Sequence, residues 1–160
     1  MTDAPRPRTY GVTPLEVMKT LSGLEFLQRM AAGELPAPPM GEPMGFGLAK
    51  IAKGEVTFSG KPTANHYNPL GTVHGGYAAT LLDSCMGCVI HSMLEPGKGY
   101  TTLEIKINYV RALTLKVPLV LATGKIIHIG RRAATSEGRL VDEAGTLYAH
   151  GTTTCMIFDL

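Results

Sequence analysis

Residues 68–93 read NPLGTVHGGYAATLLDSCMGCVIHSM, and this stretch decides the fold. Its second part predicts one long central helix over 75–93, because its apolar residues recur at helical spacing. These residues form a single stripe: Leu81, Leu82, Cys85, Val89 and Met93. The opposite face holds small residues and one carboxylate: Gly76, Ala79, Thr80, Asp83 and Gly87. Such a face allows another backbone to approach closely.

Segments of alternating polarity on both sides of this helix predict β-strands. Before the helix, 46–52 and 55–60 flank Lys53-Gly54 as in a hairpin. After it, the segment 101–110 is expected to bury one face: Leu103, Ile105, Ile107 and Tyr109. An antiparallel meander follows over three more segments: 117–129, 132–141 and 146–158. The predicted fold class is α+β, with about five to six antiparallel strands wrapped around the central helix.

The first 45 residues are expected to form an accessory piece. A helix is predicted over 14–32, with Thr13 as its cap, Pro14 at its first position and Glu16 completing a capping box. Gly33 suits the left-handed end of that helix. Four prolines in the next eleven residues, LPAPPMGEPMG, indicate an extended connector. The predicted division is therefore 1–45 for the helix and connector and 46–160 for the main domain.

Composition limits the possible classes of protein. A chain of 160 residues with 44% hydrophobic content suits one domain with a substantial core. Residues 1–11 lack the apolar stretch of a signal peptide, and no run of roughly 18 apolar residues occurs, so a soluble cytoplasmic protein is expected. The three cysteines are expected to be reduced thiols. A net charge of +2 predicts neither a nucleic-acid nor a membrane partner.

Two features of the central helix carry possible chemistry. Gly75 and Gly76 open it, so their N–H groups could stabilise an oxyanion or hold a phosphate, or the glycines could simply permit a tight turn. Asp83 is the one charged residue from 75 to 93 among Asp, Glu, Lys and Arg. It lies about 12 Å along the axis from Gly75, too far for both to act on one carbonyl within one chain. A two-fold dimer with antiparallel central helices would bring them together.

The run 68–83, NPLGTVHGGYAATLLD, resembles the signature of the phenylacetate-pathway acyl-CoA thioesterases, a branch of the 4-hydroxybenzoyl-CoA thioesterase superfamily with the hotdog fold. The resemblance covers about 46–158, because INYVRA, HIGRR and GTLYAHGTTTCMIF follow in the family's order. It implies an enzyme that hydrolyses an aryl or medium-chain acyl-CoA to a carboxylic acid and free coenzyme A, without metal or cofactor. It also implies a homodimer, with a homotetramer as the favoured larger assembly.

The resemblance assigns roles residue by residue. The catalytic carboxylate falls on Asp83, as general base or nucleophile, and the polarising backbone amide falls on Gly75. The amide that orients water or the leaving thiolate falls on Asn68, with His74 beside it, and the hydroxyl partner of the carboxylate falls on Thr102. Arginine suits phosphate, although surface arginines also occur in ordinary turns. Two groups would meet the coenzyme: Tyr109, Val110 and Arg111 in one, and His128, Gly130, Arg131 and Arg132 in the other.

Three points stay open. Gly87 departs from relatives that place a threonine one turn after the carboxylate, so that contact is missing. The N-terminal 45 residues could cover a pocket or extend an interface. The acyl group is not predicted, and a pocket for it is expected among three residues: Tyr77, Leu81 and Met86.

Functions other than thioester hydrolysis find less support in the sequence. Cys85 and Cys88 fall inside the apolar helix, where cysteine behaves as a small hydrophobe, so a metal or redox motif is not expected. Another set matches no short metal-ligand pattern: His66, His74 and Asp83. A hotdog dehydratase or hydratase would need an Asp–His or His–Glu pair, and none stands out beyond His74 and Asp83. The non-enzymatic alternative is an acyl-CoA binding module.

Overall fold

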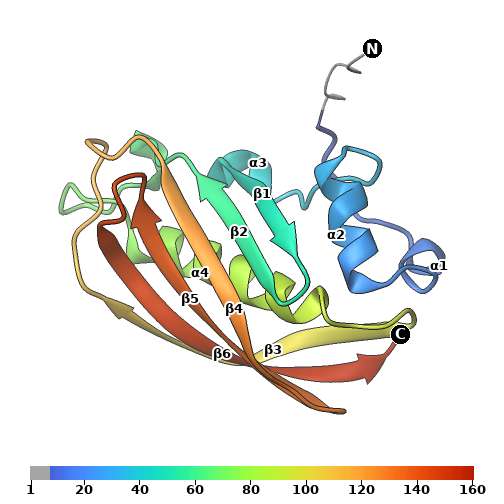
Figure 1. The fold of residues 1–160 in the computed structure, drawn as a ribbon. Coiled ribbons are helices and arrows are strands. Elements are labelled where there is room, and N and C mark those ends of the chain that lie inside the picture. Colours follow the sequence, from blue (N-terminus) through green and yellow to red (C-terminus); the bar gives the residue numbers. More distant parts are fainter. Residues whose placement is uncertain (1–7) are drawn as a thin grey trace.

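The computed structural model describes residues 8–160, and the expectation about a leader sequence in residues 1–7 lies outside this range. One long helix, α4 (Gly75–His91), packs against a six-stranded antiparallel sheet that curves around it (Figure 1). The strands are β1 (Phe46–Ala52), β2 (Glu55–Gly60), β3 (Lys98–Tyr109), β4 (Val120–Ile129), β5 (Ala133–Asp142) and β6 (Leu147–Asp159). The α+β fold class expected from the sequence is confirmed. Within residues 8–160, no helix has the length and apolar content needed to cross a bilayer.

The order of strands across the sheet is β1-β2-β4-β5-β6-β3. β4, β5 and β6 form the predicted meander, but β3 lies at the far edge beside β6. The expectation that β3 buries one whole face is wrong, because Leu103 is 62% exposed and Tyr109 is 54% exposed. Leu103 falls where the register shifts between Thr102 and Glu104, and an edge strand has a neighbour on one side only.

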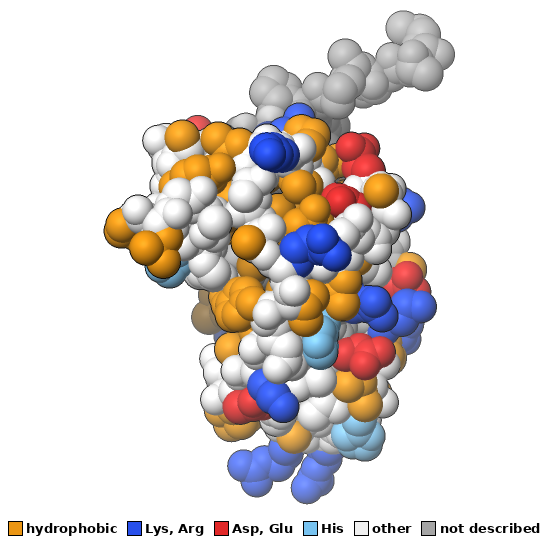
Figure 2. All heavy atoms as spheres, turned by 90° about the vertical axis from the view of Figure 1, so that its left-hand side faces the viewer, with side chains coloured by type: hydrophobic (Ala, Val, Ile, Leu, Met, Phe, Trp, Pro, Cys, Tyr) orange, Lys and Arg blue, Asp and Glu red, His pale blue; other side chains and the backbone are white. Residues whose placement is uncertain are grey.

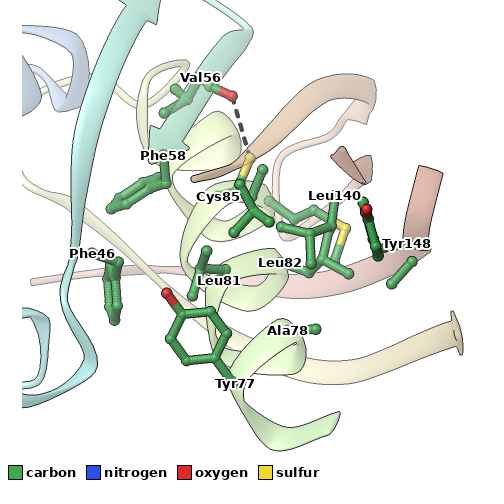
Figure 3. Packing of buried hydrophobic residues seen from close by; sticks show 14 of the residues in the cluster. Phe46, Val56, Phe58, Tyr77, Ala78, Leu81, Leu82, Cys85, Leu140 and Tyr148 are labelled. Atoms are coloured by element: carbon green, nitrogen blue, oxygen red, sulfur yellow. Dashed lines mark hydrogen bonds between the residues drawn. The ribbon is translucent and has the colours of Figure 1, made fainter. Parts of the chain in front are cut away.

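The core lies between α4 and the inner face of the sheet (Figure 3). Leu81, Leu82 and Cys85 are fully buried, and the Cys85 thiol donates a hydrogen bond to the Val56 carbonyl at 3.2 Å. The helix approaches the sheet closely because β4 carries Gly124, where a Cβ would lie 2.9 Å from the Cys85 sulfur. The predicted stripe is therefore the buried face of the helix.

The N-terminal segment contains three short helices: α1 (Leu15–Met18), α2 (Gly23–Ala31) and α3 (Gly41–Met44). The single helix predicted over 14–32 is wrong. Thr13 does not cap it, because Pro14 occupies the N-cap and no side chain caps this end. Ser22 is extended and accepts a hydrogen bond from the Glu25 N–H at 3.3 Å, so a second helix starts there.

Contact with α4 explains the break between α1 and α2. A Cβ on Gly23 would lie 1.7 Å from the carbonyl oxygen of His91, so α2 begins at a residue that must touch the end of α4. Gly33 has a φ of 72° just after α2, as expected for a left-handed end. Residues 37 and 10 then form a single parallel bridge, so the proline-rich connector is held to the chain that precedes α1.

The burial of Leu82 gives a test of this packing. Leu82→Ala should lower the free energy of unfolding by about 2–5 kcal/mol, because the truncation leaves a cavity between α4 and the sheet. Leu70, which is 90% exposed, provides a control: Leu70→Ala should change it by less than about 0.5 kcal/mol. Urea titrations followed by circular dichroism at one protein concentration measure both, and equal effects would contradict the assigned core.

Candidate active site

Asp83 lies on the exposed side of α4, directly after the buried Leu82. The Thr102 hydroxyl on β3 donates a hydrogen bond to Asp83 Oδ1 at 3.1 Å, and its oxygen lies 3.8 Å from the Cys155 sulfur on β6. The structure thus brings together the carboxylate and the hydroxyl that the sequence paired. This contact orients one carboxylate oxygen.

A cavity of about 420 Å³ opens beside this pair. One side comes from α4 and β3, including Asp83 and Thr102. The other side comes from the N-terminal segment, between residues 11 and 39. The expectation that Leu81 and Met86 line an acyl pocket is wrong, because both point into the core and are fully buried. Tyr77 is 2% exposed and borders a different hollow, at the N-terminal end of α4.

Three aromatic rings form a row in the wall of the cavity. The rings of Phe26 and His91 stack with centroids 5.1 Å apart and an interplanar angle of 22°. The Tyr100 ring lies 5.5 Å from His91 at 58°. Burial lowers the pKa of His91 from 6.5 to about 4, so the imidazole is neutral at pH 7. Burial, with smaller contributions from nearby Cys88, Cys155 and Asp83, raises the pKa of Tyr100 well above its usual value.

Tyr100 also accounts for the glycine at position 87. A Cβ on Gly87 would lie 2.9 Å from the Tyr100 ring and from its hydroxyl oxygen. The space beside the helix that a larger side chain would need is filled by this tyrosine. Sequence reasoning missed Phe26, His91 and Tyr100 as site residues. The available signal was weak: a glycine on the small-residue face, and an aromatic residue at the start of the next strand.

The other end of α4 carries the glycine pair. His74 is the N-cap, and its Nδ1 accepts a hydrogen bond from the Gly76 N–H at 2.8 Å. Among residues 8–160, the Gly75 N–H has no acceptor. The Tyr109 hydroxyl donates to the Gly75 carbonyl at 3.1 Å, and its ring lies against this glycine. One unpaired donor therefore remains at the positive end of the helix dipole.

Asn68 holds the loop before α4. Its Oδ1 accepts hydrogen bonds from the Leu70 N–H at 2.9 Å and the Thr72 N–H at 3.3 Å. Its Nδ2 donates to the Thr72 hydroxyl at 2.9 Å. These contacts use both ends of the amide, and one Nδ2 hydrogen remains for a ligand. The structure does not bring Asn68 to Asp83 within one chain.

The two groups expected to meet coenzyme A lie at opposite ends of the sheet. Tyr109, Val110 and Arg111 lie near Gly75, where Tyr109 and Arg111 border one small hollow. Gly130, Arg131 and Arg132 form the β4–β5 turn, and His128 lies at the end of β4. This turn lies toward the Asp83 end of β3, because Ala134 pairs with Cys155 and Cys155 pairs with Thr102. Thr102 and Tyr109 mark the two ends on β3, and the seven residues from one to the other span about 23 Å of strand. The end at the start of α4 shows basic side chains scattered among apolar ones (Figure 2).

Burial or hydrogen bonds within the chain account for the remaining ionisable groups near α4. Cys88 lines the cavity, and burial raises the pKa of its thiol to about 12. Burial also raises the pKa of Cys85 and Cys155. His66 Nδ1 accepts from the Thr63 N–H, and its Nε2 lies 3.0 Å from the Pro43 carbonyl oxygen. Within residues 8–160, no three His, Cys, Asp or Glu side chains gather into a possible metal site.

The architecture defines the class first, since a long helix wrapped by one antiparallel sheet is the hotdog fold. Residues 70–149 match the family model described as Thioesterase superfamily. The chain belongs to this superfamily. It is 31% identical over 105 residues to human acyl-coenzyme A thioesterase 13, covering 65% of this chain and 74% of that protein. It is 27% identical over 106 residues to 1,4-dihydroxy-2-naphthoyl-CoA hydrolase of Listeria monocytogenes, covering 66% and 85%.

Solved structures agree with this membership. A putative thioesterase of Ralstonia eutropha, described as phenylacetic acid degradation-related, is 26% identical with a TM-score of 0.75, and the match covers 82% of this chain and 98% of that one. A hypothetical thioesterase of Streptococcus pneumoniae, solved with coenzyme A, is 27% identical with a TM-score of 0.64, covering 71% and 86%. The predicted resemblance to hotdog thioesterases is confirmed, and with it the expected enzyme class of thioester hydrolases.

The buried imidazole predicts how stability depends on pH. The His91 pKa is about 4 in the folded chain and near 6.5 when unfolded, so between these values the unfolded chain binds more protons. Stability should therefore fall as the pH drops from 6.5 toward 4, by about 3 kcal/mol from this group. Urea titrations at pH 7, 5.5 and 4.5 should show a smaller loss in His91→Leu than in the native protein. Identical losses would show that His91 is not buried in its neutral form.

Proposed function

We propose that this protein hydrolyses an acyl-CoA thioester to a carboxylic acid and free coenzyme A. The observation that carries the proposal is the Asp83 carboxylate, hydrogen-bonded by Thr102 in the wall of a largely apolar cavity, in a chain of the thioesterase superfamily. The cavity would hold the acyl group and leave its thioester at the carboxylate. The two relatives above, an acyl-coenzyme A thioesterase and an acyl-CoA hydrolase, support a coenzyme A thioester as substrate.

The reaction needs three contributions from the chain. Asp83 accepts a proton from water as the water oxygen bonds to the thioester carbon, or attacks that carbon itself. A backbone N–H at the start of α4, that of Gly75, stabilises the negative charge on the carbonyl oxygen and contributes about 3 kcal/mol. The carbon–sulfur bond then breaks, and coenzyme A leaves as a thiolate that takes up the proton. If Asp83 itself attacks, the thiolate leaves an acyl–aspartyl anhydride, and water cleaves this anhydride to release the carboxylic acid, restore the carboxylate and supply the proton. Thr102 holds Asp83 in position for these steps.

The geometry favours a site shared between two copies of the chain. Asp83 and Gly75 lie at different positions of one straight helix, about 12 Å apart along its axis. Antiparallel α4 helices facing each other through their small residues would bring Asp83 of one copy to Gly75 of the other. The edge strand β3 is available for this pairing, and exposed apolar residues on and after it support an interface: Leu103, Tyr109 and Val110.

The same arrangement would unite the coenzyme-binding groups. The β4–β5 turn of one copy, with Arg131 and Arg132, would approach the segment from Tyr109 to Arg111 of the other. Guanidinium groups pair well with phosphates, so these arginines would hold the nucleotide end of coenzyme A. The structure of the Streptococcus pneumoniae relative with coenzyme A supports this class of ligand. A homodimer is thus the smallest complete enzyme in this proposal, and two dimers could pair as a tetramer.

Thiol release from acyl-CoA substrates tests the proposed chemistry. Asp83→Asn keeps the side-chain shape but removes the carboxylate, and kcat should fall by about 100-fold or more. Thr102→Val keeps the volume but loses the hydroxyl, and kcat should fall by about tenfold with little change in KM. Both variants must match the native protein in circular dichroism and size. Equal turnover in Asp83→Asn would remove Asp83 from the mechanism, and binding without turnover in the native protein would favour a binding module.

The shared site predicts that assembly and activity are lost together. Leu103→Lys places a charge on the exposed edge strand, so analytical ultracentrifugation should show the 17.0 kDa single chain in place of a dimer. Its thioesterase activity should disappear although circular dichroism stays native. Ile127→Lys is the control, because Ile127 is 55% exposed, close to the 62% of Leu103, but belongs to the interior strand β4. A fully active single chain would overturn the shared site.

A further inference from the structure

Strand β3 presents side chains to α4 in two different phases. Thr102 donates its hydrogen bond to Asp83 on α4. Further along the strand, Ile105 and Ile107 pack against the core between α4 and the sheet. Side chains of a regular strand alternate between its two faces, so residues three apart point to opposite sides. In a regular β3 that kept Ile105 and Ile107 in the core, Thr102 would therefore point away from the carboxylate.

A β-bulge at Leu103 changes the phase. Strands β3 and β6 lie side by side (Figure 1), and Thr102 pairs with Cys155 of β6. Glu104 pairs with the adjacent residue of β6, Thr154, so Leu103 is an extra residue on β3. Leu103 and Glu104 are both exposed, which breaks the alternation at this point. The bulge is thus the feature that lets Thr102 and the core residues of β3 face the same helix.

A buried threonine on β6 holds the bulge. Thr153 is 1% exposed, and its hydroxyl donates a hydrogen bond to the Glu104 carbonyl at 2.8 Å. Thr153 pairs with Ile105, so this bond fixes the peptide group between Glu104 and Ile105, where regular pairing resumes. Strand β3 lies at the sheet edge, and β6 is its one neighbour in the sheet of residues 8–160. No second strand of this sheet could hold the bulge if the hydroxyl were removed.

We propose that Thr153 is a positioning residue of the active site, whose hydroxyl holds the β3 bulge in the shape that aims Thr102 at Asp83. This inference rests on the proposed thioesterase function and adds a residue that lies outside the lining of the cavity. Catalytic groups lose rate when their supports loosen, since a misplacement of about 1 Å can cost about 100-fold. Because Thr153 acts through Thr102, its loss should cost no more activity than the loss of Thr102.

Thiol release tests this role, with whichever of phenylacetyl-CoA and octanoyl-CoA the native protein hydrolyses faster. Thr153→Val keeps the volume but loses the hydroxyl, so kcat should fall about five- to tenfold while KM stays within about twofold. Thr153→Ser keeps the hydroxyl and should retain the native kcat. Thr57→Val is the matched control, because Thr57 is 6% exposed and its hydroxyl lies 3.1 Å from that of Thr123, on strands that do not adjoin β3. The control should keep the native kcat.

A double variant separates positioning from a general loss of structure. Thr102→Val/Thr153→Val should have the kcat of Thr102→Val alone, because the hydroxyl through which Thr153 acts is already absent. Multiplied losses in the double variant would overturn the proposal, and so would a native kcat in Thr153→Val. Thr153→Ala, which also lacks the hydroxyl, replaces Thr153→Val in every measurement if the valine variant does not fold.

Crystal structures of the variants give a readout that does not depend on the proposed reaction. The distance from Thr102 Oγ1 to Asp83 Oδ1 is 3.1 Å in the native chain. It should exceed about 3.5 Å in Thr153→Val and return to the native value in Thr153→Ser. If these distances change as expected but neither thioester is hydrolysed by the native protein, the proposed function fails and the positioning of Thr102 by Thr153 stands. An unchanged distance in Thr153→Val would overturn the positioning role.

Discussion

The packing of α4 into the curved side of the sheet is the constraint on which the other features depend. One helix of 17 residues must fill the core of a six-stranded sheet, so its buried face is apolar along its length. Leu82 and Asp83 are neighbours in sequence and about 100° apart around the helix, so burial of the leucine directs the carboxylate outward. Rotation of the helix by one residue would bury an unpaired charge, which costs several kcal/mol. The direction of the candidate catalytic group is therefore a consequence of core packing.

The same helix explains why the candidate catalytic groups lie at two separate places in the chain. Asp83 lies at the middle of α4, where Thr102 on the adjacent strand β3 can donate a hydrogen bond to it. Unpaired backbone N–H groups exist at a helix start, where Gly75 lies. A straight helix cannot bring its first turn to its third, so intramolecular contact between the two groups is excluded by geometry. Symmetric association is the simplest way to join them.

Much of the fold could be predicted from periodicity, because strands and the central helix bury regular patterns of apolar residues. The same reasoning failed where a distant contact decided the local structure. Helix 14–32 is broken because Gly23 must touch the end of α4, and this contact is invisible at the sequence level. Alternation along β3 predicts a buried apolar face, but the exposure of that face depends on the position of β3 in the sheet, and alternation carries no information about strand order.

The residues of the candidate site also fall into those that the sequence could predict and those that it could not. Asp83, Gly75 and Thr102 could be proposed because a recognisable motif surrounds the helix and each has a chemical role of its own. Phe26, His91 and Tyr100 could not, since aromatic residues in three different elements acquire a joint role only when the fold brings their rings together. The sequence shows that Gly87 departs from the family pattern, but the reason for a glycine there depends on the position of Tyr100, which only the fold defines.

The raised pKa of the half-buried Cys88 has a consequence for an enzyme whose product is a thiol. Free coenzyme A is readily oxidised to disulfides, and a cysteine attacks a disulfide only as the thiolate. With its pKa raised to about 12, Cys88 holds almost no thiolate at pH 7, although it lines the cavity that would receive the substrate. A low thiolate fraction disfavours mixed disulfides between Cys88 and oxidised coenzyme A.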